Sequence, residues 1–154
     1  MVSYTNIPAE RWDDYCAVLL RWANRPGGYG PMSGVVITGI GRGEITGEIV
    51  LTPDNLNHWG TVHGGCLATL CDACAGVAGL STGYKSVTLN STMNYLRPAV
   101  GKRVVCTARV RRSGHSVCVV DVTVTDDAGR ECTTGTYTMF HGSALSDEEF
   151  WALG

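Results

Sequence analysis

Residues 65–80 form an almost wholly apolar segment that carries a single charged residue, Asp72. No other charged side chain occurs between Asp54 and Lys85. A helix that is apolar on all sides is normally a buried helix. The segment therefore predicts a central helix enclosed by the rest of the fold, with a carboxylate inside it.

A carboxylate in such a helix needs a reason to be there. Burying it without partners costs several kcal/mol unless its pKa rises or it accepts hydrogen bonds. Asp72 is therefore a candidate general base or nucleophile. The alternative is that Asp72 only accepts hydrogen bonds from a neighbouring strand or subunit and so specifies packing.

The sequence His63-Gly64-Gly65 stands where the apolar helix is expected to begin. Backbone N–H groups at a helix start have no intrahelical acceptor, and the helix dipole adds positive charge there. Such donors suit a carbonyl oxygen that becomes an oxyanion, and glycine lets a ligand approach the backbone closely. The alternative is a tight turn from strand to helix without a chemical role.

The chain contains seven irregularly spaced cysteines, which we interpret as reduced core residues of a cytoplasmic protein. Cys71 and Cys74 have the spacing of a metal or redox pair, but a helix from His63 to Cys74 would span roughly 16 Å. Zinc requires all ligands within about 2.3 Å. A redox pair needs its first cysteine exposed at a helix start, and Cys71 is in mid-helix. We expect no metal and no redox cofactor.

The length of 154 residues fits one domain, 1–154. A net charge of −2 and a pI of about 6.0 argue against a general nucleic-acid binder. No apolar run has the length and purity of a membrane span, and residues 1–10 lack the layout of a signal peptide. We expect a cytoplasmic protein without a nucleic-acid or membrane partner.

The remaining pattern predicts an amphipathic helix over 8–24, capped by Asn6 or Thr5 with Pro8 in its first turn, and then a loop over 25–32. Ser146 and Glu149 form a capping box for a short C-terminal helix. A hairpin turn is expected at 126–129. Strands are expected at 35–40, 44–51, 86–96, 103–111, 116–125 and 131–140.

Two strands, an apolar helix and four further strands describe an α+β protein in which an antiparallel sheet wraps around one central helix. We divide the domain into an N-terminal helix and loop (1–30), a core (33–140) and a short C-terminal helix (146–153).

Several separately placed motifs occur in order between about residues 35 and 140. They are Asn57 followed by Gly60, His63-Gly64-Gly65, Asp72, Val87-Thr88-Leu89-Asn90 and Asn94-Tyr95-Leu96-Arg97-Pro98. In order and spacing they resemble the hotdog-fold acyl-CoA thioesterases of the phenylacetic-acid-pathway type, in the 4-hydroxybenzoyl-CoA thioesterase-like superfamily.

This resemblance implies a hotdog fold and the hydrolysis of an aryl, medium-chain or long-chain acyl-CoA to the free acid and coenzyme A. Asp72 would be the base or the direct nucleophile, and Gly64 the donor that polarises the thioester carbonyl. Asn57 and His63 would be supporting polar groups, and the Thr88 hydroxyl would orient the attacking water. Coenzyme A would be part of the substrate, so no separate cofactor is expected.

The chain departs from the family pattern at Asn90, where an acidic residue is common, and at Ser113-Gly114-His115, which replaces a common Gly-Arg or Gly-Lys pair near the coenzyme. Seven of the twelve basic residues lie between Asp72 and Asp121, with no acidic residue among them. They could bind the phosphates of coenzyme A, or they could form a solvated strand face. We expect the substrate to contact Trp59, Gly65, Arg97, Arg111, Arg112, Gly114 and His115.

Gly64 and Asp72 lie eight residues apart, which separates their backbones by about 12 Å on one helix. Both must approach one thioester carbon to within about 3 Å. Two helices related by a two-fold axis can achieve this, so we expect a homodimer or homotetramer with sites at the interface. The alternatives are a non-catalytic acyl-CoA binding or sensing protein on the same fold, and a hotdog hydratase. A hydratase normally carries a His-Asp dyad with one residue between, which this chain lacks.

Overall fold

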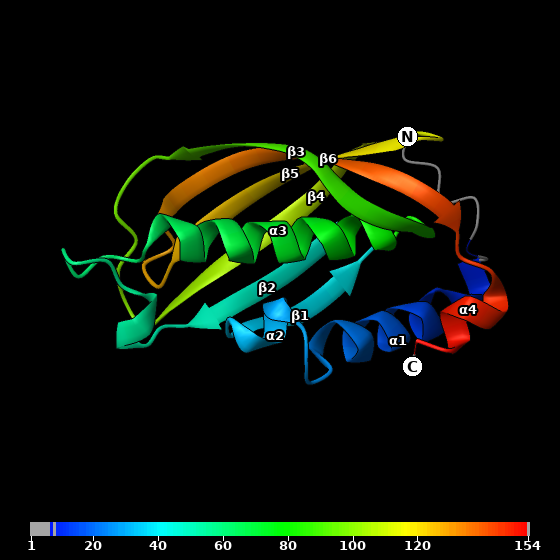
Figure 1. Cartoon of the computed structure of the whole chain (residues 1–154), viewed down its shortest axis with the longest axis horizontal. Coiled ribbons are helices and arrows are strands. Elements are labelled where there is room, and N and C mark those ends of the chain that lie inside the picture. Colours follow the sequence, from blue (N-terminus) through cyan, green and yellow to red (C-terminus); the bar gives the residue numbers. More distant parts are fainter. Residues whose placement is uncertain (1–6, 8, 154) are drawn as a thin grey trace.

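A six-stranded antiparallel sheet curves around one long helix, α3, in the computed structural model, which describes residue 7 and residues 9–153 (Figure 1). The strand order is β1-β2-β4-β5-β6-β3, so β1 and β3 are the edges. This is the architecture predicted from the sequence. The helices are α1 (Trp12–Asn24), α2 (Tyr29–Met32), α3 (Gly64–Leu80) and α4 (Asp147–Trp151), with 3-10 turns at Ala9–Arg11 and Pro53–Asn55. The strands are β1 (Val35–Gly41), β2 (Glu44–Val50), β3 (Tyr84–Tyr95), β4 (Arg103–Ser113), β5 (Val117–Asp126) and β6 (Glu131–Ala144).

Some element boundaries differ from those expected. The loop predicted over 25–32 contains the one-turn helix α2, because Ser33 N–H donates to the carbonyl of Tyr29 at 2.9 Å. β6 continues to Ala144 rather than to residue 140, because it pairs with β3 as far as Tyr84. The proposed caps Thr5 and Asn6 and the first-turn Pro8 lie outside the described residues.

The sheet covers only one side of α3. The buried residues of this helix pack against the inner face of the sheet, where apolar residues alternate along each strand. On the opposite side Gly65 and Asp72 are exposed, and Ala68, Thr69 and Gly76 are half-buried. The expectation of a helix buried on all sides, with Asp72 inside, is therefore wrong for the single chain, because one curved sheet encloses only half of a helix. The buried face of α3 consists of Leu67, Leu70, Cys71, Cys74, Ala75, Val77, Ala78, Gly79 and Leu80.

Helices α1 and α4 form a second cluster beyond the C-terminal end of α3. Tyr15 of α1 stacks on Phe150 of α4 at 4.1 Å between ring centroids, and its hydroxyl donates to the carbonyl of Leu80 at 2.9 Å. The capping box of α4 is present, with Ser146 and Glu149 bonded reciprocally. These contacts fix both terminal helices against the end of the core.

All seven cysteines are free thiols. Five of them are buried, as predicted for core residues, whereas Cys16 and Cys66 are only half-buried. Within the described ranges no helix is both long and apolar enough to cross a membrane.

Two glycines in the last half of α3 differ in their surroundings. A Cβ atom at Gly79 would lie 2.9 Å from Cβ of Ser86, which is closer than packed carbon atoms allow. A Cβ atom at Gly76 would meet no heavy atom within 4 Å. Glycine is therefore required by packing at position 79 and not at position 76.

We predict opposite effects of alanine at these two positions. Gly76→Ala should stabilise the protein by up to about 1 kcal/mol, because alanine is the better helix former. Gly79→Ala should destabilise it by about 1–3 kcal/mol, because the added methyl group overpacks the contact with β3. Urea unfolding of the two variants measures both changes, and shifts of the same sign would contradict the different packing of Gly76 and Gly79.

Candidate active site

Asp72 and Thr88 meet on the uncovered side of α3. The Thr88 hydroxyl, on β3, donates to Oδ1 of Asp72 at 2.8 Å. Both side chains are exposed in the single chain. No other described residue donates to this carboxylate, which leaves Oδ2 able to accept a hydrogen bond from a water molecule. The sequence-predicted pair of acid and water-orienting hydroxyl is therefore brought together.

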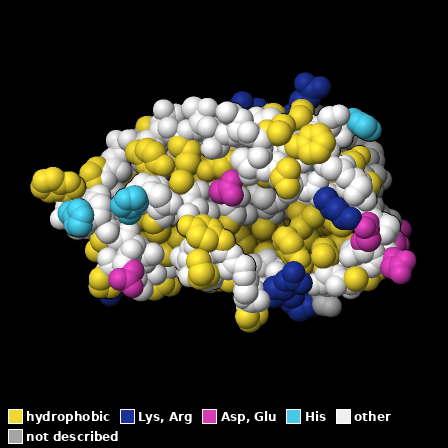
Figure 2. Space-filling model, viewed as in Figure 1, with side chains coloured by type: hydrophobic (Ala, Val, Ile, Leu, Met, Phe, Trp, Pro, Cys, Tyr) yellow, Lys and Arg dark blue, Asp and Glu magenta, His cyan; other side chains and the backbone are white. Residues whose placement is uncertain are grey.

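A large apolar cavity begins at this pair. Its volume is about 710 Å³, and Asp72 and Thr88 lie on its wall. Figure 2 shows it as a recess lined by hydrophobic side chains, with an acidic side chain at its edge. The remaining lining comes from the second half of α3, from β3, and from α1, α2, β1, β6 and the residues that flank α4. Mostly apolar pockets of about 300–1,000 Å³ with a few polar groups are typical of small-molecule sites.

The start of α3 is capped by the side chain of His63. Its Nδ1 accepts a hydrogen bond from the Gly65 N–H at 2.9 Å, so that donor is already engaged. The Gly64 N–H has no acceptor among the described residues. Of the two predicted oxyanion donors, Gly64 is therefore the one available to a ligand.

Tyr95 is a residue of this region to which sequence reasoning gave no role. Its hydroxyl donates to the carbonyl of Gly64 at 3.2 Å, and its ring lies 3.5 Å from where a Cβ of Gly64 would be. Tyr95 belongs to the motif Asn94-Tyr95-Leu96-Arg97-Pro98, but its contact with the helix start depends on the register of β3. It fixes the peptide that carries the proposed donor.

Asn57 holds together the loop before α3. Its Nδ2 donates to the Thr61 hydroxyl at 2.8 Å, and its Oδ1 accepts from the backbone N–H groups of Trp59 and Thr61 at 2.9 and 3.2 Å. The Asn57 amide therefore shapes the loop next to Gly64. Trp59, at the tip of this loop, is 90% exposed.

The predicted catalytic residues fall into two groups within one chain. Asp72 and Thr88 line the apolar cavity, whereas Asn57 and Gly64 line a different hollow of about 370 Å³, together with Tyr95 and Arg97. The two groups are about two helical turns apart, or about 12 Å. The geometry of one chain therefore does not direct Gly64 and Asp72 at one atom.

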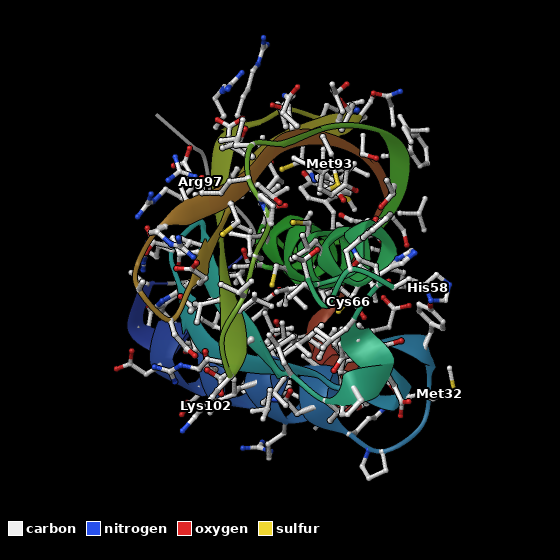
Figure 3. The ribbon with its side chains drawn as sticks, turned by 90° about the vertical axis from the view of Figure 1, so that its left-hand side faces the viewer. Met32, His58, Cys66, Met93, Arg97 and Lys102 are labelled. Atoms are coloured by element: carbon white, nitrogen blue, oxygen red, sulfur yellow. The ribbon has the colours of Figure 1, made fainter. Side chains whose placement is uncertain are left out.

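Four of the seven residues of the expected basic stripe form ion pairs, three with acidic residues of neighbouring strands and one, Lys85, with Glu149 of α4. Arg111 forms two hydrogen bonds to Asp121 of β5, at 2.7 and 2.6 Å. Arg109 pairs with Glu44 of β2 at 2.6 Å. Arg97 and Arg112 have no ion-pair partner within the described part of the chain. Figure 3 views the molecule from the end at which α3 begins, and it shows Arg97 and His58 on opposite sides of that end.

Gly114 and His115 lie in the β4–β5 hairpin, at the opposite end of the sheet from Arg97. The exposed His115 ring has Nδ1 3.3 Å from the Ser116 hydroxyl. The Gly114 carbonyl accepts from Nδ1 of the buried His141 at 3.0 Å. No sequence motif marked His141, which lies 3.2 Å from the Thr82 hydroxyl through Nε2. It joins the hairpin to the end of α3.

Within the described residues, no group of three or more His, Cys, Asp and Glu side chains is placed to hold a metal ion.

We predict a pH-dependent stability from His141. Burial lowers the pKa of this histidine below its ordinary value of 6.5, so the unfolded chain binds a proton before the folded protein does. The free energy of unfolding should therefore fall as the pH drops below 6.5. His141→Gln should flatten this dependence, whereas His115→Gln on the exposed hairpin should not. Urea unfolding between pH 5 and 8 measures this, and equal slopes in all three proteins would contradict the assignment.

Known proteins similar to this chain include thioesterases and proteins that bind coenzyme A. Residues 59–133 match the profile of the Thioesterase superfamily. A Streptococcus mutans UA159 protein, solved with acetyl-CoA bound, is 33% identical with a TM-score of 0.68, over 71% of this chain and 90% of that one. A Streptococcus pneumoniae TIGR4 protein described as a hypothetical thioesterase, solved with coenzyme A, is 32% identical with a TM-score of 0.68, over 73% of this chain and 91% of that one. Acyl-coenzyme A thioesterase 13 of Homo sapiens is 29% identical over 113 residues, which cover 71% of this chain and 81% of that protein.

Proposed function

The chain belongs to the thioesterase superfamily, and on this premise we propose that it is an acyl-CoA thioesterase, which converts an acyl-CoA and water into a carboxylic acid and coenzyme A. The observation that carries the proposal is the hydrogen bond between Thr88 and Asp72 at the wall of an apolar cavity. The binding of acetyl-CoA and coenzyme A by the two streptococcal proteins supports coenzyme A as the leaving group. The free cysteines support a cytoplasmic location, because disulfides are rare in reducing compartments.

The proposed chemistry assigns one role to each polar group. Asp72 takes a proton from a water molecule that Thr88 helps to orient, and the water oxygen attacks the thioester carbonyl carbon. The carbonyl oxygen becomes negative and accepts a hydrogen bond from the Gly64 N–H. Collapse of this intermediate breaks the carbon–sulfur bond and releases the coenzyme A thiolate. Direct attack by Asp72 would instead give an anhydride, which water then hydrolyses.

This mechanism needs Gly64 and Asp72 at one carbonyl, so we propose that two copies of the chain complete each site. β3 is an edge strand and most of its residues are exposed, so it could pair with β3 of a second copy. The uncovered side of α3 carries small residues, including Ala68 and Thr69, which would let two such helices approach closely. A two-fold axis would then bring Gly64 of one copy toward Asp72 of the other.

We predict that Asp72→Ala or Asp72→Asn lowers kcat for acyl-CoA hydrolysis by about a hundredfold or more, because general-base catalysis typically contributes 10²–10⁴. Thr88→Ala should have a smaller effect, since it removes a hydrogen bond worth about 1 kcal/mol. The double variant should be strongly non-additive, because both groups act on one water molecule. Thiol release from a series of acyl-CoAs measures these rates.

Asp14→Asn and Thr38→Ala are matched controls, because both positions are exposed and lie on α1 and β1, away from the pair. A well-folded Asp72 variant with wild-type turnover would remove Asp72 from the mechanism. Wild-type protein that binds acyl-CoA without hydrolysing it would favour a binding or sensing protein.

Subunit mixing tests the shared site. Gly64→Pro removes the proposed N–H donor at the first helical position, where proline is well tolerated. His63 already has φ −64° and ψ 135°, which suits a residue before proline. Gly64→Pro and Asp72→Ala homodimers should each be inactive, since each lacks one component of both sites.

After random exchange, half of the dimers are mixed, and each mixed dimer carries one intact site of two. The activity per subunit should therefore rise to about a quarter of the wild-type value. Mass labelling establishes that subunits have exchanged. Exchange without recovery of activity would place the whole active site within one chain.

A further inference from the structure

Gly76 is a helical glycine without a packing reason in the described chain. Glycine in a helix interior is less stable than alanine, so it normally marks a close contact. At Gly79 that contact exists, with Ser86. At Gly76 a Cβ atom would meet nothing within 4 Å.

The space beside Gly76 is the apolar cavity. Gly76 lies on its wall one helical turn beyond Asp72, followed by Val77 and Leu80. Any side chain at position 76 would project into the cavity rather than into the core, because the space there is open.

We propose that Gly76 is a specificity-determining residue, which keeps the cavity open for an extended alkyl chain of about ten carbons. This inference rests on the proposed thioesterase function, since the acyl group must extend from a thioester carbon beside Asp72.

The length follows from helix geometry. The cavity wall runs along α3 from Asp72 to Leu80, and eight residues of a helix advance about 12 Å. An extended chain of single bonds advances about 1.2 Å per bond, so about ten bonds fit along this wall. Gly76 stands about 6 Å along it, which corresponds to the fifth carbon.

The chemistry of the wall favours an alkyl chain over a charged one. Trp22, Leu145 and Leu153 also line the cavity, and all three are apolar. Lys85 is the cation on the described lining, and its Nζ is paired with Glu149 at 2.6 Å. A second carboxylate on the acyl group would therefore find no unpaired positive charge there.

The experiment measures binding of S-alkyl-coenzyme A thioethers, which cannot be hydrolysed, by calorimetry. In the wild-type protein each added methylene should raise the affinity about two- to fourfold, up to about ten carbons, and the affinity should then level off. In Gly76→Leu it should level off at about five carbons. The S-decyl compound then loses five methylene contacts, so its affinity should fall about thirtyfold or more.

In Gly76→Ala the affinity should level off at a chain length between five and ten carbons. This smaller substitution keeps the test possible if Gly76→Leu does not fold. Ala17→Leu adds the same leucine to an exposed position of α1, outside the cavity, and should leave the wild-type dependence on chain length intact. The ratio of kcat/KM for decanoyl-CoA over butyryl-CoA should fall in Gly76→Leu in step with binding.

The inference would be overturned if Gly76→Leu lowered the affinity equally at all chain lengths. It would also be overturned if the affinity for Gly76→Leu levelled off at the same chain length as for the wild-type protein. Wild-type protein whose affinity does not depend on chain length would overturn it as well. Length-dependent binding without any hydrolysis would instead leave the cavity assignment standing and refute the proposed function.

Discussion

The packing of a single helix against a single curved sheet is the constraint on which the rest of this structure depends. Six strands enclose one side of α3, and leucine, valine and cysteine side chains fill that interface. The other side stays uncovered and carries glycine, alanine, threonine and one carboxylate. A carboxylate there keeps its contact with water and needs only one protein donor, Thr88. In the single chain Asp72 is therefore accessible, without the desolvation cost that a fully buried position would impose.

The hydrogen bonds at the start of α3 leave the Gly64 N–H as the available donor. A helix start presents several N–H groups, and each must find an acceptor or face solvent. The His63 imidazole satisfies the Gly65 N–H, while Tyr95 holds the Gly64 carbonyl. What remains is the Gly64 N–H, in a fixed orientation and beside a hollow. Asn57 plays a supporting part by bonding three groups of the loop before the helix.

The distribution of charge along the sequence differs from its distribution in the folded protein, because the antiparallel sheet places residues that are distant in sequence side by side. The basic residues after Asp72 are not accompanied by acidic ones in the sequence, yet cross-strand neighbours supply Glu44 and Asp121 at hydrogen-bonding distance. Exposed pairs of this kind contribute little stability, but they reduce the field that a polyanionic ligand would encounter. Arg97 and Arg112 are left as the arginines of the expected substrate set without such partners in the described chain.

The sequence by itself determined the order of the strands and longer helices, the start of α3 at His63-Gly64-Gly65 and the capping box of α4. These follow from local signals, since periodicity and caps report on residues within a few turns of one another. The role of Thr88 beside Asp72 was implied by the resemblance to a family, and the His63 side chain as the cap of α3 is seen only in the structure. Only the tertiary structure decided that Asp72 is exposed, that Arg111 is paired with Asp121, and that His141 joins the hairpin to α3. It also decided that Gly76 faces open space whereas Gly79 faces Ser86. Each of these depends on strand register and on which side of a helix the sheet covers. Both are set by contacts between residues far apart in the chain, which no local pattern records.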